Sequence, residues 1–246
     1  MPSLKNSVQE FKKLKDEPLK TKVEYIFTYY WIPILAFVIL IAILISQIIH
    51  FSNAKETILS GHCINATGDS SGAAQFVATF AESSGIDTAS SEISIVTSQF
   101  SPGASYDSYV ANQLITAKIA AKSLDFIAAD FENLLPYAYQ EAFIDLRAIM
   151  SKEQVQTMSA YFLYMDLAVI EKLETTNDQP PVYPDPTAPE NMSHPIPFAV
   201  VIPANSEFAK LYYPHRDDAI ALAVVSTAPN PTLTVSFVDY ICNKWS

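Results

Sequence analysis

The sequence predicts an α/β protein, with one N-terminal transmembrane helix followed by a domain built on a mostly parallel sheet. Two observations lead to this prediction. Residues 31–49 are almost entirely apolar and lie in a stretch, between Glu24 and Lys55, that has no formally charged side chain. From residue 57 onward, short apolar runs alternate with runs of helical periodicity, which is typical of βαβ units. The chain therefore divides into an apolar helix and an α/β domain.

The apolar run has the length expected of a membrane span. At 1.5 Å per residue, residues 31–49 would extend over about 28 Å, close to the hydrocarbon thickness of a bilayer. Aromatic residues at positions 29–31 would lie at the headgroup boundary. Pro33 would fall in the first helical turn, where a missing N–H costs little. We expect a transmembrane helix over 31–51, with the lipid bilayer as its partner.

Charges on either side of this run predict its direction. Residues 1–24 carry six lysines, whereas only Lys55 follows the run closely. The positive-inside rule then places the N-terminus in the cytoplasm. The expected localisation is the plasma membrane, single-pass, with an extracellular C-terminal domain. The alternative is a cleaved signal peptide, but about 30 residues precede the apolar run, more than a usual n-region. Residues 1–30 form either an amphipathic helix on the inner leaflet or a solvated tail.

Composition excludes several classes of function. The net charge is −11, with 26 acidic against 15 basic side chains, so we expect no nucleic-acid partner. The five glycines all lie between positions 61 and 103, and none forms part of a P-loop or G-x-G-x-x-G motif. There is also no G-x-S-x-G nucleophile elbow. We expect no cofactor and no enzymatic activity.

The first half of the outer domain, expected over residues 55–246, alternates strands with helices. This order favours a parallel sheet with right-handed crossovers. The last helix in this half is expected to be interrupted near Pro136. The expected elements are strand 58–66, helix 73–85, strand 92–100, helix 106–122, strand 124–130 and a helix from 131.

The second half of the domain is less regular. Ser151 and Gln154 fit a capping box that opens a short helix. Residues 160–171 either continue that helix or form a strand, and their periodicity does not decide between the two. Seven prolines within 179–197 predict a loop. The expected elements after it are strand 198–203, helix 206–213, strand 219–227 and a last helix after Pro231.

Several stretches resemble a known family. ITAKIAAKSLDFIAADFENLLPYAYQEAFIDLRAIMS (115–151) and VVSTAPNPTLTVSFVDYI (224–241) resemble extracellular solute-binding proteins of the type 2 periplasmic-binding-protein fold. LKTKVEYIFTYYWIPILAFVIL (19–40) and MSHPIPFAVVI (192–202) are similar to small membrane-anchored members from Gram-positive, clostridia-type bacteria. The domain is shorter than a full two-lobed binding protein, so the resemblance implies a reduced second lobe.

Candidate ligand-binding residues follow the three strands of the first half. Ligands of parallel α/β sheets bind at the carboxyl ends of the strands, here in the loops 65–72, 98–105 and 130–133. The first loop precedes a helix whose N–H groups could hold an anion, and the alternative is simple helix capping. Acidic residues after the third strand would suit a cation, an amine or a sugar hydroxyl, and their alternative is again capping or solvation. The candidates are Asn65, Thr67, Asp69, Ser70, Ser71, Ser101, Asp130 and Glu132.

Cysteine and histidine residues add weaker signals. Cys63 and Cys242 either form a disulfide, which an extracellular location would allow, or remain two buried thiols. His62, which follows the apolar run, is expected at the surface or at the membrane interface. No metal site is expected, because the remaining candidates have no recognised ligand spacing. These candidates are His194, His215, Asp217 and Asp218.

The leading functional hypothesis is a membrane-tethered, non-catalytic binding protein for a small solute or a partner protein. The alternative is a structural or interaction subunit of a membrane transporter or sensor that has lost its ligand. A third hypothesis is an extracytoplasmic hydrolase, which would require carboxylates or histidines to converge in one cleft.

Overall fold

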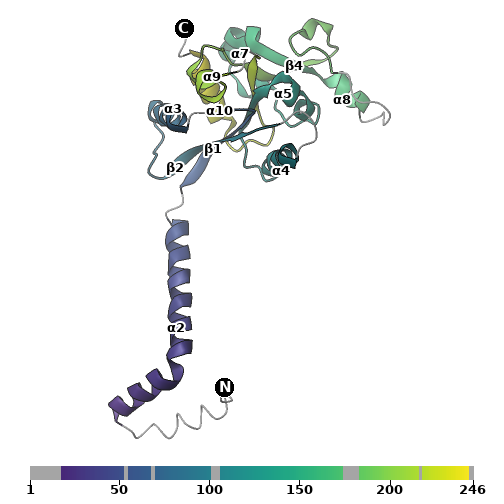
Figure 1. The fold of residues 1–246 in the computed structure, drawn as a ribbon. Helices are drawn as coiled ribbons and strands as arrows, with labels where there is room; N and C mark the ends of the chain where they lie inside the picture. Colours follow the sequence, from purple (N-terminus) through teal and green to yellow (C-terminus); the bar gives the residue numbers. More distant parts are fainter. Residues whose placement is uncertain are drawn as a thin grey trace. The chain divides into compact units, whose positions relative to one another are not determined.

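The computed structural model describes residues 18–52, 55–67, 70–100, 106–173, 183–215 and 218–243. The chain forms two compact units, Met1–Ala54 and Lys55–Ser246. In the first unit, helix α2 (Leu19–Ser52) contains Pro33 in its interior and not in its first turn. Figure 1 shows that α2 bends; an internal proline removes a backbone hydrogen bond and crowds the preceding turn.

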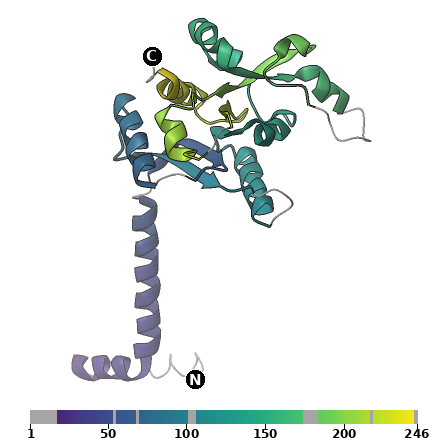
Figure 2. The ribbon, with the colours of Figure 1, turned by 45° about the horizontal axis from the view of Figure 1, so that its top comes forward.

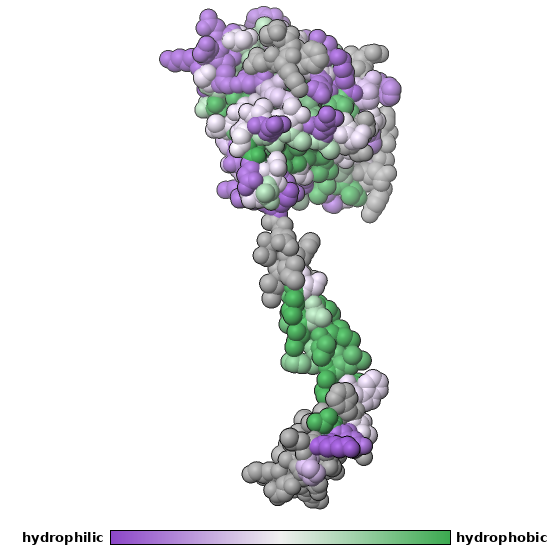
Figure 3. All heavy atoms as spheres, turned by 90° about the vertical axis from the view of Figure 1, so that its left-hand side faces the viewer, coloured by the Kyte–Doolittle hydropathy of each residue, from purple (hydrophilic) through white to green (hydrophobic). Residues whose placement is uncertain are grey.

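The prediction of a plasma-membrane localisation is wrong. The described side chains of α2 run without a gap from Trp31 to Ser46, where they are exposed and mostly apolar (Figure 3). Within the part of the chain that the structure describes, however, no helix combines the length and apolarity that a membrane crossing requires. This finding contradicts the transmembrane helix that we predicted over 31–51 and the single-pass topology that depends on it.

The second unit is built on one six-stranded sheet, whose strands lie in the order β2-β1-β3-β6-β5-β4. The strands are β1 (Glu56–Ile64), β2 (Ser91–Ser98), β3 (Phe126–Asp130), β4 (Phe162–Asp166), β5 (Pro195–Val201) and β6 (Ile220–Val224). The helices are α3 (Ser70–Ser83), α4 (Tyr106–Ala120), α5 (Phe131–Ala138), α6 (Leu146–Ile149), α7 (Lys152–Met158), α8 (Leu167–Leu173), α9 (Glu207–Tyr212) and α10 (Pro231–Asn243), with short 3-10 turns η2 (Ser159–Tyr161) and η3 (Pro189–Asn191).

The sheet is mixed, which corrects the prediction of a mostly parallel one. β1 pairs in parallel with β2 and β3, as expected. β3, β6, β5 and β4 then pair antiparallel, each with the next. A parallel direction was predicted because β6 is buried along its whole length, like the parallel β3. Such continuous apolar runs are typical of parallel strands but also occur wherever helices cover both faces of a sheet.

Helices cover the sheet on both faces and create two cores (Figures 1 and 2). One face packs against α3, α9 and α10 through a cluster of aromatic rings, and the other packs against α4, α5 and α8. Centroid distances in the aromatic cluster run from 4.6 Å for Phe208–Tyr212 to 6.4 Å for Phe208–Tyr213, in the range of favourable ring contacts. Gly61 in β1 is required by this packing, because a Cβ there would overlap the Phe126 ring.

A buried carboxylate ties the beginnings of the strands together. Asp125 accepts hydrogen bonds from the backbone N–H of Ser60 (2.7 Å) and of Asn230 (2.8 Å). The Asn230 side chain in turn donates to the carbonyl of Ile58 at 2.8 Å. Burial raises the pKa of Asp125 and outweighs the two N–H donors, which act in the opposite direction. This network joins β1, β3 and the loop before α10 at the end of the sheet opposite the predicted ligand loops.

Other local predictions can be compared element by element. The capping box of Ser151 and Gln154 opens α7 as predicted. Residues 160–171, which periodicity left undecided, divide into β4 and α8 with the boundary at Asp166. The predicted proline-rich loop 179–197 is shorter than expected, because β5 begins at Pro195, although residues 179–182 lie outside the described range.

Candidate functional site

The first two predicted ligand loops are tied to each other at the carboxyl ends of β1 and β2. The backbone N–H of Asn65 donates to the carbonyl of Ser98 at 2.6 Å, and Asn65 Oδ1 accepts from the N–H of Phe100 at 2.6 Å. The Gln99 amide donates to the carbonyl of Ala66 at 2.7 Å. Asn65 adopts φ 56°, a left-handed conformation that asparagine tolerates. The Asn65 amide oxygen therefore serves the loop structure.

The other predicted site residues are spread over this end of the sheet. Asp130 caps α5, and its Oδ1 accepts from the backbone N–H (3.0 Å) and side-chain amide (2.8 Å) of Asn133. Glu132 is exposed in the first turn of α5. Thr67 and Ser71 are exposed, and Ser70 is the first residue of α3. Asp69 and Ser101 lie outside the described residues. A shared ligand for these residues stays a prediction.

The disulfide between Cys63 and Cys242 is not formed. Both residues are free thiols, one in β1 and one in α10, which corresponds to the alternative that we considered. Burial raises the pKa of the Cys63 thiol to about 12 and that of Cys242 to about 11. Because the thiolate is the reactive form, neither cysteine is activated as a nucleophile.

His62 is fully buried, which corrects its expected surface position. It lies in the middle of β1, and its Nε2 is 2.8 Å from Ser98 Oγ. Its Nδ1 has no hydrogen-bond partner among the described residues. Burial, reinforced by the charge of Lys118, lowers the pKa of His62 to about 4. His62 is therefore neutral at physiological pH.

The remaining metal candidates do not come together. His194 and His215 are exposed, and the backbone N–H of His194 donates to Asp166 at 2.9 Å. Asp217 lies outside the described residues. Across the described ranges, no group of three histidine, cysteine or acidic residues is placed to hold a metal ion.

A groove runs along the surface between α3 and β2, and we call it the α3–β2 groove. It consists of two adjoining hollows of about 430 and 210 Å³, which share Ala74, Val77 and Ile93 as lining residues. Figure 3, viewed from the side on which α3 and β2 lie in Figure 1, shows hydrophobic atoms at the surface of this unit. The larger hollow is lined by Ala73, Ala74, Val77, Ile93, Ile95, Thr97 and Tyr212.

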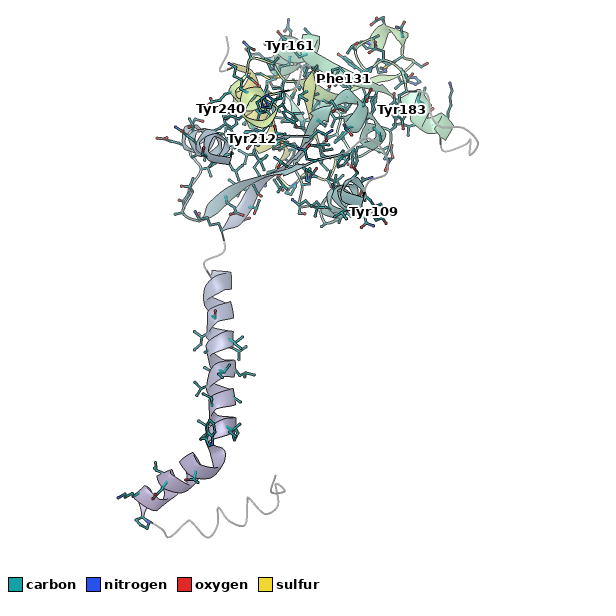
Figure 4. All side chains as sticks on the ribbon, viewed as in Figure 1. Tyr109, Phe131, Tyr161, Tyr183, Tyr212 and Tyr240 are labelled. Carbon is teal, nitrogen blue, oxygen red and sulfur yellow. The ribbon has the colours of Figure 1, made fainter. Side chains whose placement is uncertain are left out.

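Polar groups of the groove lie at its rim and are already hydrogen-bonded. Lys55 Nζ donates to the carbonyl of Thr88 at 2.6 Å, and Glu92 Oε1 accepts from the hydroxyl of Thr57 at 2.9 Å. Tyr212, labelled beside α3 in Figure 4, is buried at one end of the groove, and this burial raises the pKa of its hydroxyl. The lining of the groove is thus mainly apolar.

The edge of the sheet beside this groove is open. Among the described residues, β2 pairs only with β1, and the Asn65–Ser98 hydrogen bond shows that Ser98 faces β1. Because backbone direction alternates along a strand, Ile93, Ile95 and Thr97 direct their N–H and C=O groups away from β1. Their side chains line the groove. The same three residues therefore supply both an apolar surface and unpaired backbone groups.

Of the predicted ligand residues that the structure describes, none lines the α3–β2 groove. Thr67 comes closest, since its backbone N–H donates to the carbonyl of Tyr212 at 2.9 Å. The sequence contained a signal that we did not use. Glu92, Ile93, Ser94 and Ile95 alternate polar with apolar, which indicates a half-buried strand, whereas residues 126–129 are continuously apolar. That difference marks β2 as the more exposed strand.

Comparisons with known proteins place the chain in no family. No family model matches it, and no curated protein matches its sequence. Its structure aligns with the ABC substrate-binding protein Lmo0181 from Listeria monocytogenes, solved in complex with cycloalternan, at 11% identity and a TM-score of 0.28 over 51% of this chain and 35% of that one. It also aligns with the uncharacterized protein lmo0859 from Listeria monocytogenes EGD-e, at 14% identity and a TM-score of 0.28 over 52% of this chain and 34% of that one. The chain thus spans about a third of these proteins, and neither alignment assigns a ligand to it.

Proposed function

We propose that the second unit is a non-catalytic binding domain that takes up an extended, largely apolar segment of a partner protein along β2. One observation carries this proposal. The three residues with outward-facing backbone groups, Ile93, Ile95 and Thr97, also line the larger hollow of the α3–β2 groove. Strand addition requires this combination, because main-chain hydrogen bonds provide affinity while pockets for alternate side chains provide specificity.

The chemistry of the groove supports an apolar segment. An added strand would lie about 4.8 Å from β2 and would direct every second side chain toward the groove. Those side chains would contact Val77, Ile93 and Ile95, which are only partly buried. Each buried CH₂ group contributes about 0.8 kcal/mol, so apolar side chains would be favoured over polar ones at these alternate positions.

Absence of catalysis is part of the proposal. The charged groups at the groove rim, Lys55 and Glu92, are hydrogen-bonded to neighbours. The neutral His62 lies on β1 opposite Val96, whose neighbours Ile95 and Thr97 line the groove. The His62 side chain, however, contacts Ser98 and is not part of the groove lining. Acid–base or nucleophilic chemistry needs such a group within hydrogen-bond reach of the substrate.

A small solute is the competing occupant. The larger hollow, at about 430 Å³, falls within the volume range of small-molecule sites. Among its lining residues, however, only Thr97 and Tyr212 carry polar side chains that could orient a solute. The unpaired backbone of β2 has no role in that alternative, and we therefore favour the strand.

The test uses capped eight-residue peptides of alternating valine and threonine with a fluorescent label, added to the full chain in a nonionic detergent that covers the apolar side chains of α2. We expect binding in fluorescence anisotropy, and at least tenfold weaker binding by the Ile95→Lys variant. Leu114→Lys is the control, because Leu114 on α4 is an exposed apolar residue (44%) away from the groove. This control should bind like the unmodified chain.

Two methylated peptides sharpen the test. One carries N-methyl groups on the valine amides and the other on the threonine amides, so each blocks one hydrogen-bonding edge of the peptide strand. Binding should be lost with one peptide and kept with the other; loss with valine methylation indicates antiparallel addition. Equal binding of both peptides overturns the proposal. A metabolite panel provides a second way to overturn it: no peptide binds, and a solute raises the melting temperature of the unmodified chain but not that of Ile95→Lys.

A further inference from the structure

We infer that the strand taken up along β2 is β2 of a second copy of this chain, paired antiparallel about a twofold axis at Ile95. This inference rests on the proposed function and names its partner. A twofold interface must be self-complementary, so each contact made by one copy is repeated by the other. The question is whether β2 can satisfy that condition with itself.

The spacing of the open backbone positions meets the condition. Ile93 and Thr97 lie at equal distances from Ile95 along β2, and all three direct their backbone groups outward. In the register centred on Ile95, Ile93 of each copy lies opposite Thr97 of the other, and the two Ile95 residues face each other. These are hydrogen-bonded positions of an antiparallel ladder, where each pair exchanges two hydrogen bonds. If the second strand shifted by two residues relative to the first, one of these three positions on each copy would no longer lie opposite another of the three.

Side chains on both faces are compatible with this register. On the groove side, Ile95 would contact Ile95 of the second copy, and cross-strand pairs of β-branched residues stabilise sheets. On the other side, Glu92 would lie opposite Ser98 and Ser94 opposite Val96. Glu92 is the only charged residue in β2, and it does not meet its own copy. The pairing therefore opposes no like charges directly.

Only one of the two sheet edges is available for such pairing. At the other edge, the N–H of Tyr164 in β4 donates to the carbonyl of Pro186 at 2.8 Å. A segment of the same chain therefore covers β4, while β2 has no such cover among the described residues. This difference makes closed pairs the expected product instead of extended chains of copies.

Net charge opposes the association of two copies. The chain carries a formal charge of −11, so two copies repel each other at long range. Added salt screens this repulsion while leaving apolar contact and backbone hydrogen bonds in place. We expect the dimer to become tighter as sodium chloride rises, which is opposite to the behaviour of an interface held by ion pairs.

The experiment is analytical ultracentrifugation of the full chain in nonionic detergent, combined with disulfide trapping. We expect a dimer whose dissociation constant rises at least tenfold with Ile95→Lys or Thr97→Lys and is unchanged with Leu114→Lys. Thr97 is exposed, so its substitution leaves folding intact. Ile95→Cys should give a covalent dimer under mild oxidation and Leu114→Cys should not, because cysteines facing each other across a strand pair lie within disulfide range.

The outcomes separate the inference from the proposed function. A chain that stays monomeric, yet binds the valine–threonine peptide in an Ile95-dependent manner, overturns the second copy as partner and retains strand addition. A dimer that is indifferent to both lysine variants, or that Ile95→Cys does not trap, also overturns the inference. A monomer that binds no peptide overturns both proposals.

Discussion

The two edges of the sheet are managed in different ways. At the β4 edge, the chain folds back and places the carbonyl of Pro186 on the N–H of Tyr164, and Asp166 holds the returning segment through the N–H groups of Ser193 and His194, both at 2.9 Å. At the β2 edge, the outward backbone groups have no such cover among the described residues. Open strand edges invite pairing with other chains, and proteins usually block them. The contrast supports our proposal that the open edge is the one used for binding.

The largest expected effect comes from removing the anchor of the covered edge. Asp166 is buried and accepts from the backbone N–H groups of Ala168, Ser193 and His194. Burial alone would raise its pKa, but these three donors and the nearby His194 together lower it. Asp166→Ala removes the acceptor of these three partly buried N–H groups, so we expect a loss of about 3 kcal/mol in the free energy of unfolding, measured by urea denaturation.

Asp185→Ala is the matched control for that prediction. Asp185 lies in the same covering segment and accepts from Thr187, but it is fully exposed. Its loss should change stability much less than the loss of Asp166. Equal effects of the two substitutions would show that Asp166 does not anchor the covered edge.

The stability of the part of the sheet near the open β2 edge should depend on pH through His62 in β1. Because the pKa of folded His62 is about 4, the unfolded chain binds a proton first as the pH falls below 6.5. Stability should therefore decrease from pH 6.5 to pH 4, by up to about 3 kcal/mol, and then level off. His62→Gln should abolish this dependence in urea unfolding curves measured across the range.

The exposed His215 provides the comparison for His62, since His215→Gln should leave the slope between pH 6.5 and 4 intact. Asp166 acts in a different window. Its folded pKa is lowered, so its contribution is present above about pH 3.8 and is lost as the pH falls through the folded value. If stability still changes between pH 6.5 and 4 in His62→Gln, the assignment of this pH dependence to His62 is contradicted.

The smallest expected effect is a difference in amide exchange at the two edges. In dilute, monomeric chain, the amides of Ile93, Ile95 and Thr97 should exchange with deuterium faster than the amide of Tyr164, which is hydrogen-bonded to Pro186. NMR-detected exchange would measure this. Raising the chain concentration should protect the first three amides and leave Tyr164 unchanged. Slow exchange at β2 in the monomer would show that its edge is already covered.

Local elements were predictable because they depend on residues close together in the sequence. The capping box at Ser151 needs only a side chain three residues away, and Gly85, which follows α3, adopts φ 67°, a conformation favourable for glycine. Strand direction was not predictable in the same way. An apolar run such as residues 220–224 is equally suited to parallel and antiparallel pairing once both faces are covered.

Site residues were harder to predict than elements. Polar side chains at strand ends are candidates for ligand contact, but Asn65 and Asp130 use their oxygens on neighbouring loop and helix N–H groups. His62 was expected at the surface or at the membrane interface because it follows the apolar run, yet it is fully buried and contacts Ser98. The groove was missed because its residues, such as Val77 and Ile95, are indistinguishable from core residues in the sequence.

The sequence by itself determined the α/β class, most of the helices and strands, and the parallel pairing of the first three strands. These follow from hydrophobic periodicity and capping, which are local properties of the chain. Only the tertiary structure decided the insertion of β6 between β3 and β5, the absence of a disulfide and the difference between the covered and the open edge. Each of these depends on which distant segments meet, and distant contacts are set by packing of the whole domain.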